Sequence, residues 1–257
     1  MIQLTIMSKE REPMERGSLY CVSTGPGDPM LMTLKAVQVT EQCPVVALSV
    51  DFTRRDKSCG KKDTKSLKEN CAAYQIAAPV VKGIEGKEHL FLSMPMTKDK
   101  EVLSASHRQA ADRIIEYLSQ GISVAWLTLG DTTIYASSLY AARLVKEGGY
   151  QVELISGVPS FCAAAARLGE PLVSGSQQLH ILPSSYRIEE ALACPGTKVL
   201  MKAGSRLSQV KKLLTEQGFE AKGVQRCGMK GEKVYPSAAE LDEEAGYYTL
   251  LIVKERD

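Results

Sequence analysis

The chain lacks the long hydrophobic runs that a membrane-spanning segment needs. Its longest apolar stretches, residues 44–50 and 247–253, have the length of single β-strands, far below the ~18 residues of a transmembrane candidate. The first 16 residues mix acidic and basic side chains and contain no apolar core of secretory length. We therefore expect residues 1–16 to be a frayed extension rather than a signal peptide, no membrane partner, and a cytoplasmic protein.

The chain also lacks an excess of charge of either sign. Its 32 Lys and Arg residues against 30 Asp and Glu residues leave a net charge of +2. Because nucleic-acid-binding domains are usually strongly basic, we expect no nucleic-acid partner. With 257 residues, of which 44% are hydrophobic, the chain is long enough to bury a core without disulfides or a metal ion.

Sequence patterns that bind metal ions are missing as well. None of the three histidines has a His or Cys neighbour at helical ligand spacing, and no two of the seven cysteines form a C-x-x-C pair. We therefore expect no metal site. The odd number of cysteines and the apolar surroundings of Cys21, Cys43 and Cys162 predict free, buried thiols in a reducing compartment.

The chain does contain a regular alternation of strand-like and helix-like segments, which predicts an α/β fold. The double glycine Gly148-Gly149 ends a helical segment and predicts a boundary between domains 1–148 and 149–257. Ser104 or Ser106 is the expected cap of a helix over residues 104–120, and residues 51–71 are expected to form a loop. The expected strands are residues 18–22, 45–50, 122–128, 151–155, 179–182, 198–201 and 247–253.

Three glycine-containing turns follow predicted strands and precede predicted helices. The first, GPGDP at residues 25–29, lacks both G-K-[ST] and the G-x-G-x-x-G spacing. It therefore indicates either a general anion site at a helix N-terminus or a plain turn.

The second turn, Leu129-Gly130-Asp131, lies at the carboxyl end of a strand, where open parallel sheets bind ligands. Glycine would let a ligand approach the backbone, and Asp131 would bind the ligand, cap a helix, or do both. In the third turn, residues 156–161, Ser160 is the expected helix cap. The absence of G-x-S-x-G excludes a serine-hydrolase nucleophile.

The segment RRDKSCGKKDTK, residues 54–65, carries six basic and two acidic residues. This local charge of +4 leaves two readings open: a contact for a polyanionic small molecule through charge-assisted hydrogen bonds, or a solvated surface loop.

Three segments resemble the ordered motifs of the tetrapyrrole methylase family: SLYCVSTGPGDPMLMTLKA, LTLGDTTIYASSLYAARL and VELISGVPSFCAAAARLGEPL. The resemblance runs from Gly17 to nearly the end of the chain. PMTKDKEVL (residues 95–103) and QRCGMKGEKVY (residues 225–235) are similar to the branch that methylates C20 of precorrin-2. Two residues depart from the pattern: Thr132 stands where many relatives have proline, and Cys21 where glycine is common.

The resemblance implies two consecutive α/β domains with S-adenosylmethionine (SAM) bound in the cleft between them, and a homodimer. The cofactor-binding residues it implies are Leu129, Gly130, Asp131, Ile134, Tyr135, Ser160, Phe161, Met201 and Lys202, with residues 226–228 as further candidates. Substrate contacts are expected from Gly25, Pro26, Gly27 and Asp28, and, for the substrate carboxylates, from Arg54, Arg55, Lys61 and Lys62.

The implied activity is SAM-dependent methyl transfer to C20 of precorrin-2 or of its cobalt chelate in cobalamin biosynthesis. Such a reaction needs no strong general base, and the sequence indicates no particular catalytic residue. Three alternatives remain: a sibling methylase acting on uroporphyrinogen or on another precorrin position, a methylase of this fold acting on a protein side chain or on ribosomal RNA, and a SAM-binding module without turnover.

Overall fold

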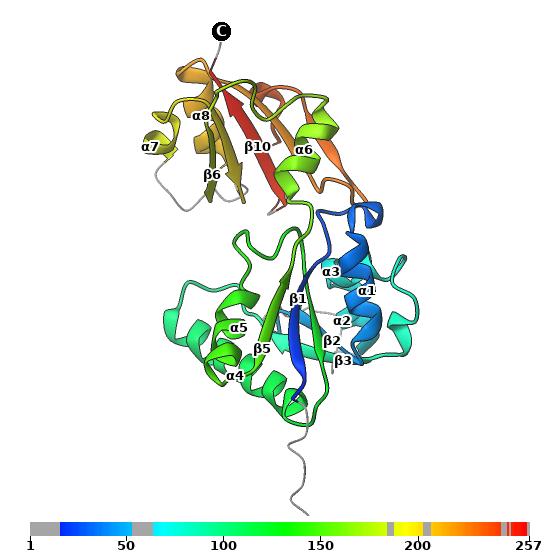
Figure 1. Ribbon diagram of the computed structural model, residues 1–257. Helices are drawn as coiled ribbons and strands as arrows, with labels where there is room; N and C mark the ends of the chain where they lie inside the picture. The colour runs from blue at the N-terminus through cyan, green and yellow to red at the C-terminus, as the bar shows by residue number, and fades with distance from the viewer. Residues whose placement is uncertain are drawn as a thin grey trace, which may run out of the picture.

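The computed structural model describes residues 16–52, 64–183, 188–202, 207–242, 246 and 248–255. These residues form two lobes, each built on a five-stranded sheet that carries helices (Figure 1). The α/β class and the two consecutive α/β units are therefore confirmed. No helix within the described ranges is both long and apolar enough to cross a membrane.

The first sheet is parallel throughout and has the order β3-β2-β4-β1-β5. Its strands are β1 (Ser18–Ser23), β2 (Val45–Val50), β3 (Glu88–Ser93), β4 (Val124–Thr128) and β5 (Gln151–Ile155). The helical segments around it are η1 (Pro29–Leu31), α1 (Leu34–Gln42), α2 (Thr64–Glu69), α3 (Ala72–Ala77), η2 (Ile84–Gly86), α4 (Lys100–Leu118) and α5 (Ser138–Glu147).

Helices on both faces of this sheet explain why its central strands have continuous apolar runs. One core lies between the sheet and helices α4 and α5, and a second core lies under α1 and α3. In β4, Trp126 is fully buried, and its indole N–H donates to Ser49 Oγ at 3.0 Å. The largest core side chain therefore has its polar atom satisfied.

The second sheet is mixed and has the order β6-β7-β10-β8-β9, in which only β6 and β7 pair in parallel. Its strands are β6 (Leu179–Pro183), β7 (Thr197–Met201), β8 (Glu220–Gln225), β9 (Lys233–Tyr235) and β10 (Thr249–Lys254). Helix α6 (Ser160–Leu168) packs on one face, and α7 (Ile188–Leu192), α8 (Leu207–Glu216) and η4 (Ala238–Glu240) pack on the other.

The predicted boundary at Gly148-Gly149 places residues 151–155 in the second domain, but strand β5 belongs to the first sheet. Residues Ser18–Val22 of β1 pair in parallel with all five residues of β5, so the chain completes the first sheet after Gly148-Gly149. The division at residue 148 stays a prediction, and a boundary after Ile155 would keep each sheet within one unit.

Other local expectations also changed. Helices α2 and α3 occupy parts of the region expected to be a loop or left unassigned, and strands β3, β8 and β9 were not predicted. The expected burial of the thiols holds for Cys21 and Cys43, but Cys162 is exposed because α6 turns its neighbours Phe161 and Ala164 toward the sheet.

The start of helix α4 corrects the expected cap. The helix begins at Lys100, and Asp99 Oδ1 accepts the backbone N–H groups of Glu101 and Val102 at 2.9 and 3.2 Å. Ser104, one of the caps expected from the sequence, lies inside the helix.

We predict that Asp99→Ala lowers the free energy of unfolding by about 1 kcal/mol, because two N–H groups of the first turn lose their acceptor. Ser104→Ala is the matched control, and alanine is the better helix former at an interior position. Urea denaturation of both variants measures the difference. A larger loss for Ser104→Ala would contradict the observed helix start.

Candidate cofactor and substrate site

A pocket of about 340 Å³ lies between the two sheets. Its first wall comes from the carboxyl ends of strands in the parallel sheet and the segments that follow them. Its second wall comes from α6 and from the ends of β7, β8 and β10. The lining residues include Pro26, Ser49, Asn70, Met94, Thr128, Leu129, Gly130, Asp131, Ile134, Tyr135, Ser138, Ser160, Met201, Lys202, Arg226, Cys227, Met229, Tyr248 and Leu250.

The first two glycine turns are joined by a reciprocal pair of backbone hydrogen bonds. Gly130 N–H donates to Gly25 O at 2.7 Å, and Gly25 N–H donates to Gly130 O at 3.2 Å. Both glycines have left-handed backbone angles, with φ of 78° and 76°, which other residues adopt only with strain. The two turns therefore form one unit at the floor of the pocket.

Asp131 ties the third turn to this unit. Its Oδ2 accepts the backbone N–H of Gly157 at 2.7 Å, and its Oδ1 accepts the N–H and hydroxyl of Thr133 at 2.8 and 2.5 Å. Burial alone would raise the pKa of Asp131, but the hydrogen bonds from Gly157 and Thr133 hold it below the ordinary value of 3.8. The carboxylate is thus an acceptor for backbone N–H groups of the protein, although Asp131 also lines the pocket.

Gly157 and Thr132 complete the junction of the three turns. A Cβ atom on Gly157 would lie 2.4 Å from Ser23 Cβ and 3.0 Å from Gly130 O, so no larger residue can occupy this position without displacing its neighbours. The backbone N–H of Thr132 donates to the buried Ser23 Oγ at 2.8 Å. A proline at position 132 could not make this bond, so the departure at this position supplies a contact of its own.

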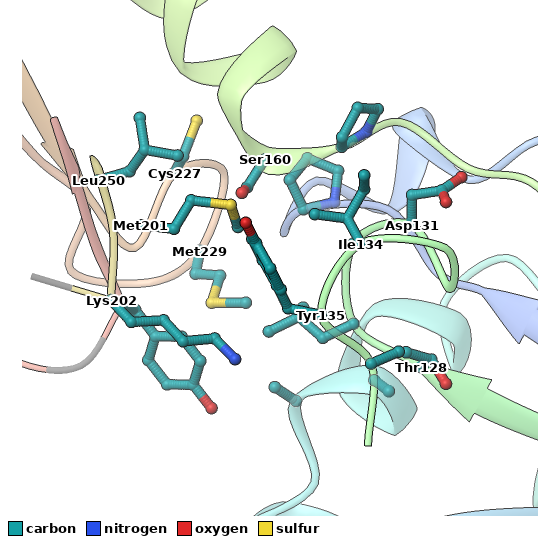
Figure 2. A pocket seen from close by; sticks show the side chains of 18 of the residues that line it. Thr128, Asp131, Ile134, Tyr135, Ser160, Met201, Lys202, Cys227, Met229 and Leu250 are labelled. Atoms are coloured by element: carbon teal, nitrogen blue, oxygen red, sulfur yellow. The ribbon is translucent and has the colours of Figure 1, made fainter. Parts of the chain in front are cut away.

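Ile134 and Tyr135, which follow Asp131 in the chain, connect the three joined turns to the second sheet. Ile134 packs in the core formed by α6 and the second sheet. The Tyr135 hydroxyl donates to Ile181 O, in β6, at 3.0 Å. Figure 2 shows the Tyr135 side chain between Met201, Met229 and Lys202 on one side and Asp131 and Thr128 on the other.

Within the described part of the chain, the non-glycine residues with positive φ are Tyr135, Lys202 and Arg226, and all three line this pocket. Such angles cost about 1–3 kcal/mol each and concentrate at functional sites. Lys202 follows β7 and Arg226 follows β8, the strands on either side of β10. Two cationic residues therefore lie on the second wall, where they favour a ligand with negative groups.

The loop Gly25–Asp28 packs mainly against protein. A Cβ atom on Gly27 would lie 2.1 Å from the backbone oxygen of Cys227. Asp28 Oδ1 accepts the N–H of Met30 at 2.9 Å and so caps η1. Gly27 is therefore needed because the backbone of Cys227 lies close to it. Of the four residues of this loop, Pro26 lines the pocket. Their contact with substrate stays a prediction.

The structure brings most of the predicted cofactor residues together. Leu129, Gly130, Asp131, Ile134, Tyr135, Ser160, Met201 and Lys202 all line the pocket. Phe161 does not: its side chain is 6% exposed and packs in the core under α6. Ser160 is the first residue of α6, preceded by Pro159 at the cap position, so its expected capping role is wrong. Arg54, Arg55, Lys61 and Lys62 lie outside the described residues.

Several lining residues were missed by sequence reasoning. Ser49 and Met94 lie at or just beyond the carboxyl ends of β2 and β3. The rule that identified Leu129 also applies to Ser49 in the predicted strand 45–50, and it would have found Met94 had β3 been recognised. Asn70 and Tyr248 carry no comparable signal in the sequence, because their position depends on how distant segments pack.

The pocket thiols are poor nucleophiles. Burial, together with the nearby carboxylate of Glu232, raises the pKa of Cys227 to about 11. Burial also raises the pKa of Cys71. At neutral pH both side chains therefore remain protonated, and the reactive thiolate form is scarce. Within the described ranges, no group of three or more His, Cys, Asp or Glu side chains is placed to hold a metal ion.

The comparison with known families assigns the chain to a class. A model of the tetrapyrrole (corrin/porphyrin) methylases matches residues 18–242. This match covers most of the chain, and the chain therefore belongs to the tetrapyrrole methylase family.

Individual relatives show which members of the family the chain resembles. The chain is 32% identical to the probable cobalt-precorrin-2 C(20)-methyltransferase of Methanocaldococcus jannaschii, over 92% of this chain and 95% of that protein. It is 29% identical to the precorrin-2 C(20)-methyltransferase of Sinorhizobium sp, over 92% and 95%. The uroporphyrin-III C-methyl transferase from Thermus thermophilus, solved with S-adenosyl homocysteine, has the same fold: TM-score 0.64, 21% identity, 93% and 98% coverage.

We predict that Asp131→Asn lowers the free energy of unfolding at neutral pH by about 2 kcal/mol, since charge-assisted hydrogen bonds contribute about 1.5–3 kcal/mol each. The native pKa is lowered, so this stabilisation is present above the ordinary pKa and is lost as the pH falls through the native pKa. Urea midpoints of wild type and variant should therefore converge in acid. A difference that does not change with pH would contradict the role given to the ionised carboxylate.

Proposed function

We propose that this protein transfers a methyl group from SAM to C20 of precorrin-2 or cobalt-precorrin-2, a step in cobalamin biosynthesis. The observation that carries the proposal is the pocket between the two sheets, where all three family motifs meet. The position of methylation is supported by relatives named C20-methyltransferases, which match nearly the whole chain.

The cofactor is proposed to lie against Gly130. A Cβ atom built on this glycine would meet nothing within 4 Å, so the space beside its backbone is open. Ile134, Ser160, Met201 and Lys202 line the same pocket and are the proposed neighbours of the cofactor. The bound S-adenosyl homocysteine in the solved relative of the same fold supports SAM as the methyl donor.

Catalysis is proposed to depend on placement. The sulfonium of SAM supplies an activated methyl group, so the protein has to align the meso carbon, the methyl group and the sulfur. Such alignment can lower the activation barrier by about 7–11 kcal/mol. The protonated thiols Cys71 and Cys227 would leave the substrate carbon as the competent nucleophile in the pocket.

Substrate carboxylates are proposed to meet the cationic residues Lys202 and Arg226 on the second wall. On the first wall, Ser49, Asn70 and Thr128 offer hydrogen-bonding groups. The basic residues of segment 54–65 and the Gly25–Asp28 loop stay additional proposed contacts. A cobalt ion, where present, would belong to the substrate.

The proposal is tested by incubating the protein with methyl-labelled SAM and precorrin-2, with and without cobalt, and locating the added methyl by NMR. We expect one methyl group at C20. A methyl at another carbon, or methylation of uroporphyrinogen-III, would identify a sibling methylase. Binding of SAM without turnover of any of these tetrapyrroles would indicate a SAM-binding module.

The protein is further proposed to be a cytoplasmic homodimer. Strand β5 lies at an edge of the first sheet, and unpaired sheet edges readily take up another strand. Large apolar side chains flank this edge: Leu34 and Met30 are 89% and 81% exposed, and Leu154 is 43% exposed. The ion pair from Lys35 Nζ to Glu153 Oε1, 2.6 Å, keeps α1 beside β5. A second copy related by a twofold axis would pair the two edges and cover these side chains.

We predict that Leu34→Lys shifts the protein toward monomers and raises the dimer dissociation constant at least about tenfold, because a charged group would be buried in the apolar contact. Val102→Lys, at an exposed apolar position of α4, is the control and should leave the dimer intact. Sedimentation equilibrium measures both. A monomeric wild type, or equal behaviour of the two variants, would rule out this interface.

A further inference from the structure

The turn between β8 and β9, residues 226–232, forms part of the pocket wall and is itself held by a side chain. Backbone hydrogen bonds run from Met229 N–H to Arg226 O at 2.9 Å and from Glu232 N–H to Met229 O at 3.1 Å. Arg226, Cys227 and Met229 line the pocket. Figure 2 shows Cys227 and Met229 on the same side of the pocket as Met201 and Leu250.

Glu232, at the end of this turn, binds in two directions. Its Oε2 accepts the backbone N–H of Gly228 at 2.7 Å, across the turn. Its Oε1 accepts from Arg167 Nε, on helix α6, at 2.5 Å. The N–H of Gly228 and then the guanidinium of Arg167 hold the pKa of Glu232 below its ordinary value. The turn is thereby attached to the helix that begins with Ser160 at the pocket.

Gly228, whose N–H is bound by Glu232, also touches the other lobe. A Cβ atom on Gly228 would lie 2.5 Å from the backbone nitrogen of Asp28. One residue earlier, the oxygen of Cys227 faces Gly27 at a distance that leaves no room for a side chain. The 226–232 turn therefore joins the second sheet to the Gly25–Asp28 loop at one contact, and a displaced Gly228 would open that contact.

We propose that Glu232 is a positioning residue for methyl transfer. It holds Gly228 against the Gly25–Asp28 loop, so that Cys227 and Met229 close the cofactor side of the pocket. The inference rests on the proposed SAM site. Glu232 acts through the turn, and its carboxylate is engaged by Gly228 and Arg167 rather than by a ligand.

A merely structural role would give a different result. Ion pairs that are open to solvent on one side contribute little to global stability; here the Arg167 side chain is 57% exposed and the Glu232 side chain 20% exposed. Removing the pair should therefore lower the unfolding temperature only slightly, through the lost acceptor of Gly228 N–H, while it weakens cofactor binding. The tetrapyrrole KM should rise together with the SAM KM, because Arg226 of the same turn is a proposed contact of the substrate carboxylates.

The test compares Glu232→Ala, Glu232→Gln and Arg167→Met with wild type and with Glu216→Ala. Glu216 forms an exposed ion pair with Lys212 on α8, on the other face of the second sheet. SAM affinity is measured by titration calorimetry, the two KM values and kcat by turnover of precorrin-2, and stability by thermal unfolding.

We expect Glu232→Ala to raise the SAM dissociation constant about tenfold, as the loss of a charge-assisted hydrogen bond predicts. Glu232→Gln keeps an acceptor for Gly228 N–H, so it should restore most of the affinity. Arg167→Met should resemble Glu232→Gln, and Glu216→Ala should resemble wild type.

The inference is overturned if wild type binds SAM and Glu232→Ala binds it within twofold. It is also overturned if the affinity falls only together with the unfolding temperature and Glu232→Gln gives no rescue. If Glu232→Ala does not fold, the comparison of Glu232→Gln and Arg167→Met with Glu216→Ala decides in the same way. If wild type itself binds no SAM, the proposed cofactor site and this inference fall together.

Discussion

The carboxylate of Asp131 and the backbone pair Gly25–Gly130 are the contacts on which the rest of the site depends. They join three turns, the first of which lies more than a hundred residues before the other two, and each turn follows a strand of the parallel sheet. The carboxyl ends of neighbouring strands bring these turns within reach of one another. The hydrogen bonds then fix them as one unit, and Ile134 and Tyr135 extend that unit to the second lobe.

Other contacts at the pocket hold backbone angles that a free peptide would avoid. Tyr135, Lys202 and Arg226 all have positive φ at the pocket. Two of these residues make hydrogen bonds that hold their segments: the Tyr135 hydroxyl donates to Ile181 O, and Arg226 N–H donates to Tyr248 O. Strain of this kind persists only where surrounding contacts determine the conformation. It therefore indicates where the fold gives up stability to place side chains.

The sequence predicted the elements whose signal is local. The apolar run of β4 and the turn at Gly130 were recognised because a strand buried on both faces and a glycine at its end are visible within ten residues. The start of α4 was missed because Asp99 and Ser104 are both residue types that favour the cap position, so residue type alone does not choose between them. Strand β5 was misplaced because a double glycine resembles a boundary, whereas pairing with β1 depends on residues 133 positions earlier. The site residues followed from resemblance, and resemblance did not separate Phe161, a core side chain, from its pocket neighbours.

The packing around Gly27, Gly157 and Gly130 distinguishes glycines that protein contacts require from a glycine that leaves room for a ligand. A Cβ atom on Gly27 would meet the Cys227 oxygen, and one on Gly157 would meet Ser23. These two glycines are therefore required by the protein itself, whatever the pocket binds. Gly130 differs: its left-handed angle closes the turn with Gly25, yet the space beside its Cα is open. Of these three positions, Gly130 is the one at which the absence of a side chain leaves room for a ligand at the backbone. The strained Tyr135 lies five residues further along the same segment. Together, the open space at Gly130 and Tyr135 mark the part of the site that the protein's own side chains leave uncovered.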